Sequence, residues 1–182
     1  MGQICILVVD DFERWRHLVS SMIGKEGDLQ VAGEASDGLE AVQKAKALKP
    51  DLVLLDIGLP KLNGLVVARR IRRLSPCSKI LFLSQESSPD VVREALKVGV
   101  GFVVKTDAAK ELLSAVNAVM LDRQFLSSRL ADTLRDAEVP CGTGRGKDLK
   151  QLSPAKHSKE ISTIPAASRK TGADSTGRCH TI

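Results

Sequence analysis

Aromatic residues are scarce in this 182-residue chain, which has no tyrosine, one tryptophan and four phenylalanines. Proteins that bind single-stranded nucleic acid commonly stack the bases on aromatic side chains. The shortage therefore argues against that mode of binding. The chain also lacks any apolar run near the ~18 residues that suggest a membrane span, so we expect no membrane partner.

The four cysteines are widely separated and form no Cys-x-x-Cys pair. They stand at Cys5, Cys77, Cys141 and Cys179. The chain starts with Met-Gly-Gln and passes straight into an apolar stretch, without the composition of a secretory signal. These features predict a protein with reduced thiols in the cytoplasm.

The net charge of +5 is unevenly distributed along the chain. Residues 137–182 hold eight Lys and Arg against four Asp and Glu, or +4, whereas residues 1–136 hold 19 against 18, or +1. The last 46 residues are poor in large aliphatic side chains and rich in Ser, Thr, Gly and Lys, which favours disorder. We therefore expect a folded domain over residues 1–122, a linker helix over 123–138 and a basic, low-complexity, disordered tail over 139–182.

Five aliphatic stretches of strand length alternate with five segments whose apolar residues repeat at helical spacing. The predicted strands are residues 4–9, 30–35, 52–56, 79–83 and 101–104, and the predicted helices are 12–24, 36–48, 64–74, 88–98 and 107–120. Because parallel neighbours need crossover helices, this alternation predicts an α/β fold: a doubly wound, five-stranded parallel sheet with helices on both faces.

Polar residues follow four of these strands, at the edge where ligands collect in such sheets. They are Asp10 and Asp11, Asp56, Ser84 and Lys105. One aspartate at a strand end is commonly a helix cap, but three carboxylates, a hydroxyl and an ammonium at one edge are harder to explain in that way. Carboxylates so placed repel one another unless a cation lies between them, and Mg²⁺ suits such oxygen ligands. A metal beside a lysine fits phosphoryl transfer, with Asp56 as the nucleophile that forms an aspartyl phosphate.

With these residues, positions 1 to about 125 resemble the receiver domain of two-component response regulators. The family pattern is an acidic pair after the first strand, Asp-x-x-x-Pro-x-x-x-Gly around the phosphorylated Asp, Thr or Ser after the fourth strand, and Lys after the fifth. This chain has Asp10-Asp11, Asp56-Ile-Gly-Leu-Pro60 continuing to Gly64, Ser84, and Phe102-Val-Val-Lys105. The resemblance implies a flavodoxin-like receiver fold. It also implies a signalling switch rather than an enzyme, with Mg-dependent self-phosphorylation and self-dephosphorylation as its only chemistry.

The resemblance assigns a role to each matching position. Asp56 would accept a phosphoryl group from a histidine kinase. Asp11 and Asp56 would bind Mg²⁺ directly, Asp10 would act through metal-bound water, and the backbone carbonyl of Gly58 would be the third protein ligand. Lys105 would pair with the phosphoryl oxygens.

A switch is implied at Ser84 and Phe102. Ser84 would hydrogen-bond a phosphoryl oxygen, and Phe102 would turn inward as Ser84 moves; the simpler interpretation of Phe102 is a core aromatic. This would change the face formed by helix 88–98, strand 101–104 and helix 107–120, which could bind a partner or a second copy. Helices 12–24 and 107–120 form the other candidate dimer surface. Gly58 and Glu86 flank the phosphate, and we predict that they set the lifetime of the phosphorylated state.

The output of the protein stays open between two classes. Residues 124–134 resemble the segment after the receiver in NarL/LuxR-type regulators, where a helix-turn-helix domain follows. The tail lacks the length and periodicity of such a domain. One hypothesis is a stand-alone receiver that signals by protein contact or relays phosphate. The alternative is a NarL/LuxR-type transcriptional regulator with a degenerate or truncated helix-turn-helix domain, whose basic tail makes weak, salt-sensitive contacts with DNA phosphates.

Overall fold

The computed structural model describes residues 2–131, and the predicted tail and residues 132–138 of the predicted linker helix lie outside them. The strands are β1 (Ile4–Val9), β2 (Leu29–Ala35), β3 (Leu52–Leu55), β4 (Lys79–Ser84), β5 (Gly101–Val104) and β6 (Phe125–Leu126). The helices are α1 (Glu13–Ile23), α2 (Gly38–Leu48), α3 (Gly64–Leu74), α4 (Pro89–Leu96) and α5 (Ala108–Met120), and a 3-10 turn, η1 (Lys105–Asp107), precedes α5. In this part of the chain no helix is long and apolar enough to cross a membrane.

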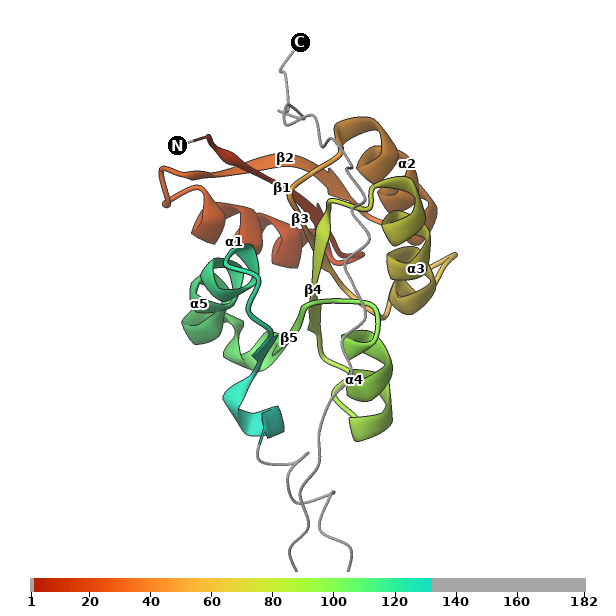
Figure 1. Cartoon of the computed structure of the whole chain (residues 1–182), viewed down its shortest axis with the longest axis vertical. Coiled ribbons are helices and arrows are strands. Elements are labelled where there is room, and N and C mark those ends of the chain that lie inside the picture. Colours follow the sequence, from red (N-terminus) through yellow and green to blue (C-terminus); the bar gives the residue numbers. More distant parts are fainter. Residues whose placement is uncertain (1, 132–182) are drawn as a thin grey trace, which may run out of the picture. The chain divides into compact units, whose positions relative to one another are not determined.

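The strands form one parallel sheet in the order β2-β1-β3-β4-β5-β6. Helices α1 and α5 cover one face, and α2, α3 and α4 cover the other (Figure 1). The predicted doubly wound α/β fold is thereby confirmed. β2 lies on one side of β1 in the sheet and β3 lies on the other side. The direction in which strands are added therefore reverses between β1 and β3. Ligands of such sheets bind outside the carboxyl ends of the strands at this point.

The continuous aliphatic run of β3 is explained by burial on both faces of the sheet. Val53 and Leu55 belong to the apolar cluster beneath α2, α3 and α4, whereas Leu52 and Leu54 belong to the cluster beneath α1 and α5. Alternate side chains of a strand point to opposite faces, so a strand covered on both sides needs apolar residues at every position. The strand is consequently held rigidly, and its last residue leads directly into Asp56.

Gly64 allows α3 to start against the end of β3. A Cβ atom at this position would lie 2.1 Å from the backbone oxygen of Asp56 and 2.7 Å from the Cα of Ile57. The Gly64 N–H donates to the carbonyl of Ile57 at 2.9 Å, and the side chain of Asn63 caps the helix by accepting from the N–H of Leu65 at 2.9 Å. This close approach ties the loop after Asp56 to the helix.

The sixth strand is one more than the five expected. Within the predicted linker helix, residues 123–138, Phe125 and Leu126 pair with β5 instead, and the described helical structure begins at residue 128. The reason is the outer edge of β5, whose backbone groups need partners. A strand of two residues is too short to show alternating apolar and polar residues, so the sequence pattern could not predict it.

Ser127 fastens this segment to the sheet. It is fully buried, its N–H donates to the carbonyl of Phe102 at 2.9 Å, and its Oγ accepts from the N–H of Val104 at 3.0 Å. The Ser127 hydroxyl in turn donates to the Glu111 carboxylate on α5. The chain after α5 is therefore hydrogen-bonded to the strand that leads into Lys105.

Candidate functional site

The carboxyl edge of the sheet brings the predicted polar residues together around one pocket. The pocket has a volume of about 450 Å³. It is lined by Asp11, Phe12, Trp15, Asp56, Gly58, Ser84, Gln85, Glu86 and Lys105. Asp10 lies behind it, 2% exposed. Each predicted site residue on the strand ends is thus in or next to this pocket, as the parallel topology requires.

Lys105 is the electrostatic centre of the site. Its Nζ lies 2.7 Å from Asp56 Oδ2 and 2.6 Å from Asp10 Oδ2, and all three side chains are nearly buried. The contact with Asp56 is a hydrogen bond, whereas the contact with Asp10 is an ion pair without hydrogen-bond geometry. One ammonium therefore offsets the charge of two carboxylates from different strands.

Burial and ion pairing act against each other in this triad. Burial raises the pKa of the Asp10 carboxyl above its ordinary value, although the Lys105 ammonium and the N–H of Phe12 oppose the rise. Burial by itself would lower the pKa of Lys105, but the contacts with Asp10 and Asp56 outweigh it, and the pKa of the ammonium is raised. The lysine is thus held in its charged form beside Asp56.

The Asp56 carboxylate is oriented by its own loop as well as by Lys105. Its Oδ1 accepts from the N–H of Ile57 at 2.7 Å and from the N–H of Gly58 at 3.3 Å, while its Oδ2 accepts from Lys105. The residue is 6% exposed and borders the pocket. The acid at the end of a buried strand is therefore fixed in orientation and still open to a ligand.

The acidic residues meet the requirements of a divalent cation site. One carboxylate oxygen each from Asp10, Asp11 and Asp56 lies within 4.8 Å of the others. The buried Oδ2 of Asp10 contacts the Lys105 ammonium at 2.6 Å, and Asp11 is exposed and lines the pocket. Oxygen donors with one side open to water are what Mg²⁺ prefers, so these residues fit the ion.

Ser84 and Phe102 lie on neighbouring strands but have different surroundings. The Ser84 Oγ is buried at the pocket and accepts from the N–H of Glu86 at 3.2 Å. The ring of Phe102 is fully buried and packs against Phe82, with ring centroids 6.3 Å apart. The inward position that the switch hypothesis gives to Phe102 is thus the position it occupies here, while the Ser84 hydroxyl is bonded to its own loop.

Gly58 and Glu86 border the pocket from two different loops. Both are exposed, and a Cβ atom at Gly58 would meet only Asp56 Oδ2, at 3.9 Å. The Oε1 of Glu86 accepts from the N–H of Ser88 at 3.1 Å, and this hydrogen bond keeps the pKa of the Glu86 carboxyl below its ordinary value. A side chain introduced at Gly58 would therefore have room to begin beside the pocket, whereas the Glu86 carboxylate is hydrogen-bonded within its own loop.

Sequence reasoning missed two residues of α1 that contact the site. Trp15 lies in the predicted helix 12–24 and is not among the predicted site residues, yet its ring faces the Lys105 ammonium, which lies 5.6 Å from the ring centroid. Arg16 donates to the backbone carbonyl of Asp10 at 2.9 Å and pairs with Glu34 at 3.3 Å, which anchors the turn after β1. The contacts of Trp15 with Lys105 and of Arg16 with Glu34 join different elements of the fold, and no sequence pattern signals them.

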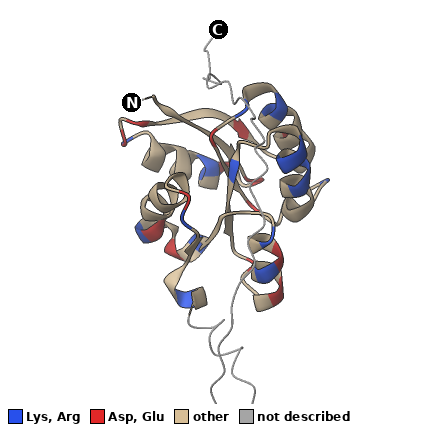
Figure 2. Ribbon diagram, viewed as in Figure 1, with Lys and Arg blue, Asp and Glu red and all other residues tan. Residues whose placement is uncertain are grey.

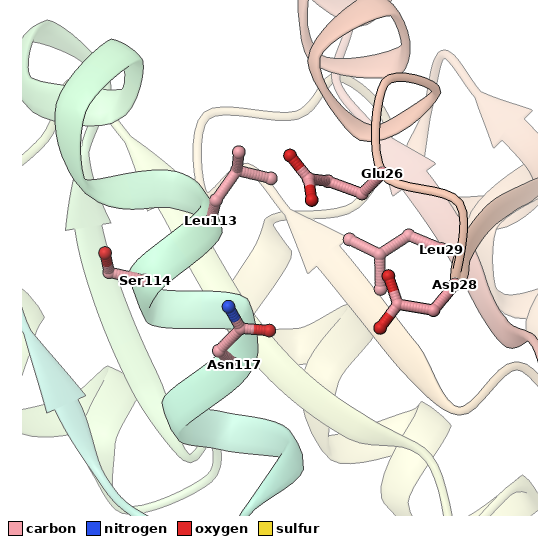
Figure 3. A pocket seen from close by; sticks show the side chains of 6 residues that line it. All are labelled: Glu26, Asp28, Leu29, Leu113, Ser114 and Asn117. Carbon is pink, nitrogen blue, oxygen red and sulfur yellow. The ribbon is translucent and has the colours of Figure 1, made fainter. Parts of the chain in front are cut away.

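A second pocket, of about 250 Å³, lies near the amino ends of the strands. Figure 3 shows Glu26, Asp28 and Leu29 on one side of it and Leu113, Ser114 and Asn117 of α5 on the other. None of the predicted site residues borders this pocket.

Helix α3 has four arginines along its length (Figure 2). Arg69 pairs with Glu94 of α4 at 3.3 Å, and Arg72 donates to the backbone carbonyls of Lys97 and Val98. Half of this positive charge therefore serves to join α3 to α4.

Comparison with known proteins gives a consistent family. Residues 6–117 match the model of the response regulator receiver domain. The chemotaxis protein CheY of Thermotoga maritima is 39% identical over 115 residues, which are 63% of this chain and 95% of CheY. The nitrate/nitrite response regulator NarL of Escherichia coli is 32% identical over 150 residues, 82% of this chain and 69% of NarL. The response regulator VraR of Staphylococcus aureus is 37% identical over 114 residues, but the match spans only 54% of its length.

Solved structures agree with these relatives. A LuxR-family response regulator from Aurantimonas has a TM-score of 0.73 and 26% identity, covering 76% of this chain and 100% of that one. The receiver domain of a NarL-type regulator from Mycobacterium tuberculosis has a TM-score of 0.64 and 31% identity, covering 68% of this chain and 100% of that one. Since the family model matches well over half of the chain, this protein belongs to the response regulators of two-component systems, through a receiver domain with NarL- and LuxR-type relatives.

Proposed function

We propose that this protein is a phosphorelay response regulator that accepts a phosphoryl group on Asp56 from a histidine kinase. The observation that carries the proposal is the position of Lys105, whose ammonium contacts the carboxylates of both Asp10 and Asp56 at the rim of an open pocket. Phosphoryl transfer depends mainly on positioning and on neutralising charge. A charged lysine 2.7 Å from the nucleophile supports that chemistry.

In the proposed reaction, a carboxylate oxygen of Asp56 attacks the phosphorus atom, and the bond from phosphorus to the kinase imidazole nitrogen breaks. The imidazole leaves, and the phosphoryl group is joined to Asp56 as an acyl phosphate. Lys105 then pairs with a phosphoryl oxygen, and the Ser84 hydroxyl donates to another. The backbone N–H groups of Ile57 and Gly58 keep the carboxylate in its orientation during the attack.

The proposed metal ligands are the carboxylates of Asp11 and Asp56 and the backbone carbonyl of Gly58, with Asp10 acting through water. When bound, Mg²⁺ supplies positive charge that offsets the negative charge of the phosphoryl group and of the acidic cluster. The three clustered carboxylates, which carry more negative charge than the single Lys105 ammonium offsets, support this assignment. The exposed position of Gly58 is compatible with its share in the site.

Phosphorylation is tested by incubating the protein with acetyl phosphate and Mg²⁺ and measuring the intact mass. We expect the wild type to gain one phosphoryl group and Asp56→Ala to gain none, because the nucleophile is absent. The control is Asp90→Asn, which changes a highly exposed acid on α4 and should be labelled like the wild type. Equal labelling of the wild type and Asp56→Ala would refute the site assignment.

The lifetime of the acyl phosphate is proposed to depend on Gly58 and Glu86. Gly58→Arg would place a guanidinium near the phosphoryl flank, from a position where a Cβ atom has room, and Glu86→Ala would remove a carboxylate able to orient the attacking water. We expect each change to slow dephosphorylation by roughly tenfold, which corresponds to about 1.4 kcal/mol in the barrier. Decay of the phosphorylated mass after removal of acetyl phosphate measures this rate. Unchanged decay in both variants would contradict the hypothesis.

Signalling is proposed to reach partners through the face of α4, β5 and α5, with α1 and α5 as the other candidate dimer surface. Lys105 directly follows β5, which contains the buried Phe102. This connection between the site and β5 supports the surface formed by α4, β5 and α5. Membership of a family of signalling switches supports a regulatory rather than a metabolic role.

DNA-binding transcriptional regulation is the second candidate function. The observation in its favour is the NarL match, whose 150 residues must extend beyond residue 131. The eight Lys and Arg of residues 137–182 would then contact DNA phosphates. We expect gel-shift binding at low salt that is lost at physiological salt and on truncation after residue 138, because few phosphate contacts are strongly screened. Sequence-specific binding that survives physiological salt would instead reject the stand-alone receiver.

A further inference from the structure

Trp15 contacts the charged centre of the site without belonging to the family pattern stated above. Its ring centroid lies 5.6 Å from the Nζ of Lys105, inside the range in which an ammonium is attracted by the face of an indole. Trp15 and Lys105 both line the pocket that contains Asp56. The ammonium thus has two carboxylates on one side and an aromatic ring on another.

The position of the indole is set by packing and by this cation, not by a hydrogen bond. Trp15 packs against the apolar cluster under α1 and α5, which includes Val19 and Ala108. Its Nε1 is buried and has no hydrogen-bond acceptor among residues 2–131. Tryptophan N–H groups usually find a partner when buried, so placing the ring here has a cost that its contact with Lys105 offsets.

We propose that Trp15 is a positioning residue, which holds the Lys105 ammonium at the pocket wall for the phosphoryl transfer proposed above. The lysine has a flexible four-carbon stem, and the ring adds a third contact to an ammonium that the two carboxylates already hold. The ring restricts it to the side where the incoming phosphoryl group must lie. Preorganised charge of this kind lowers the barrier because it needs no rearrangement during the reaction. The inference rests on the proposed function of Asp56.

The competing explanation is that Trp15 only fills the core between α1 and α5. Trp15→Phe and Trp15→Leu separate the two explanations, since both keep an apolar side chain but only phenylalanine keeps an aromatic face. Leu18→Ala is the control, because Leu18 lies on the same helix and is exposed. Urea unfolding of each variant shows whether it is folded under the assay conditions.

The rate of Asp56 phosphorylation by acetyl phosphate is measured by intact mass. We expect Trp15→Leu to be about fivefold slower than the wild type, which corresponds to about 1 kcal/mol, the strength of a cation–π contact. Trp15→Phe should stay within about twofold of the wild type, and Leu18→Ala should match it. A wild-type rate in Trp15→Leu, or equal losses in both Trp15 variants, would overturn the positioning role.

A spectroscopic measurement tests the contact without phosphorylation. Trp15 is the only tryptophan, and a protonated amine against an indole quenches its emission. We expect Lys105→Met to emit more strongly than the wild type in metal-free buffer, and the difference to vanish in denaturant. Equal emission in the folded proteins would overturn the contact. If the contact is present but the wild type gains no phosphoryl group, the proposed function fails, and with it the role of Trp15 in that reaction.

Discussion

Lys105→Met is expected to lower the free energy of unfolding by about 3 kcal/mol at pH 7 in metal-free buffer, because it leaves buried carboxylates without their counter-ion. Methionine keeps most of the side-chain volume, so the loss is electrostatic. Asp10 and Asp56 are 2% and 6% exposed, and water can therefore replace the ammonium only in part. Urea unfolding measures the change, assuming a two-state transition.

The pH dependence of this loss follows from the directions of the pKa shifts. The pKa of Lys105 is raised in the folded protein, so its stabilisation is complete below the unfolded pKa near 10.4 and is lost only as the pH rises through the folded value. The pKa of Asp10 is raised by burial, and protonation of Asp10 at lower pH removes one unpaired charge from the variant. We therefore expect a smaller loss at pH 5 than at pH 7.

The control for this prediction is Lys110→Met, which changes an exposed lysine of α5. It should alter the free energy of unfolding by no more than about 0.5 kcal/mol. A Lys105→Met protein as stable as the wild type at pH 7, or one whose deficit is the same at pH 5, would show that the carboxylates do not depend on the ammonium.

Gly64→Ala is expected to destabilise the domain by about 3 kcal/mol, the upper end of the usual cost of overpacking. Its Cβ would lie 2.1 Å from the oxygen and 2.9 Å from the carbonyl carbon of Asp56. These are backbone atoms at the end of a buried strand, so they cannot rotate away. Alanine is the better helix former, and a loss of stability would therefore come from the clash. Because the clash is with Asp56 itself, the phosphorylation rate should fall as well.

Gly58→Ala provides the matched control for Gly64→Ala. A Cβ atom at Gly58 would be in ordinary contact with Asp56 Oδ2 at 3.9 Å, so we expect a change of no more than about 0.5 kcal/mol. Urea unfolding of the two variants side by side measures the difference. Equal stability of the two would mean that the loop after Asp56 can move away from α3.

The fold was predictable because its signals are local. Aliphatic runs such as residues 52–55 and the repeated apolar spacing of the helices predict the order of elements, and parallel connection then requires a sheet covered on both faces. The sixth strand was not predictable. Phe125 and Leu126 are extended because β5 has a free edge next to them, and nothing in their own sequence requires it.

The gathering of these polar residues at one edge of the sheet was predictable, but their contacts were not. The positions of Asp10, Asp56 and Lys105 at strand ends place them at one edge of the sheet. Their positions at the strand ends do not show which charges pair. In the structure the Lys105 ammonium lies between the carboxylates of Asp10 and Asp56. The contacts of Trp15 and Arg16 were missed because each depends on how α1 packs against the sheet. The direction in which a side chain points toward a neighbouring element produces no periodic pattern in the sequence.

The sequence alone therefore determined the five helices and the first five strands, their order, and which residues reach the carboxyl edge, since these depend on local propensity, hydrophobic period and chain direction. Only the tertiary structure decided the pairing of Lys105 with Asp10 and Asp56, the ring of Trp15 beside that ammonium, and the docking of Ser127 on β5. Those features arise from distances of a few ångströms between segments far apart in the chain, and such distances are set by packing, not by neighbours in sequence.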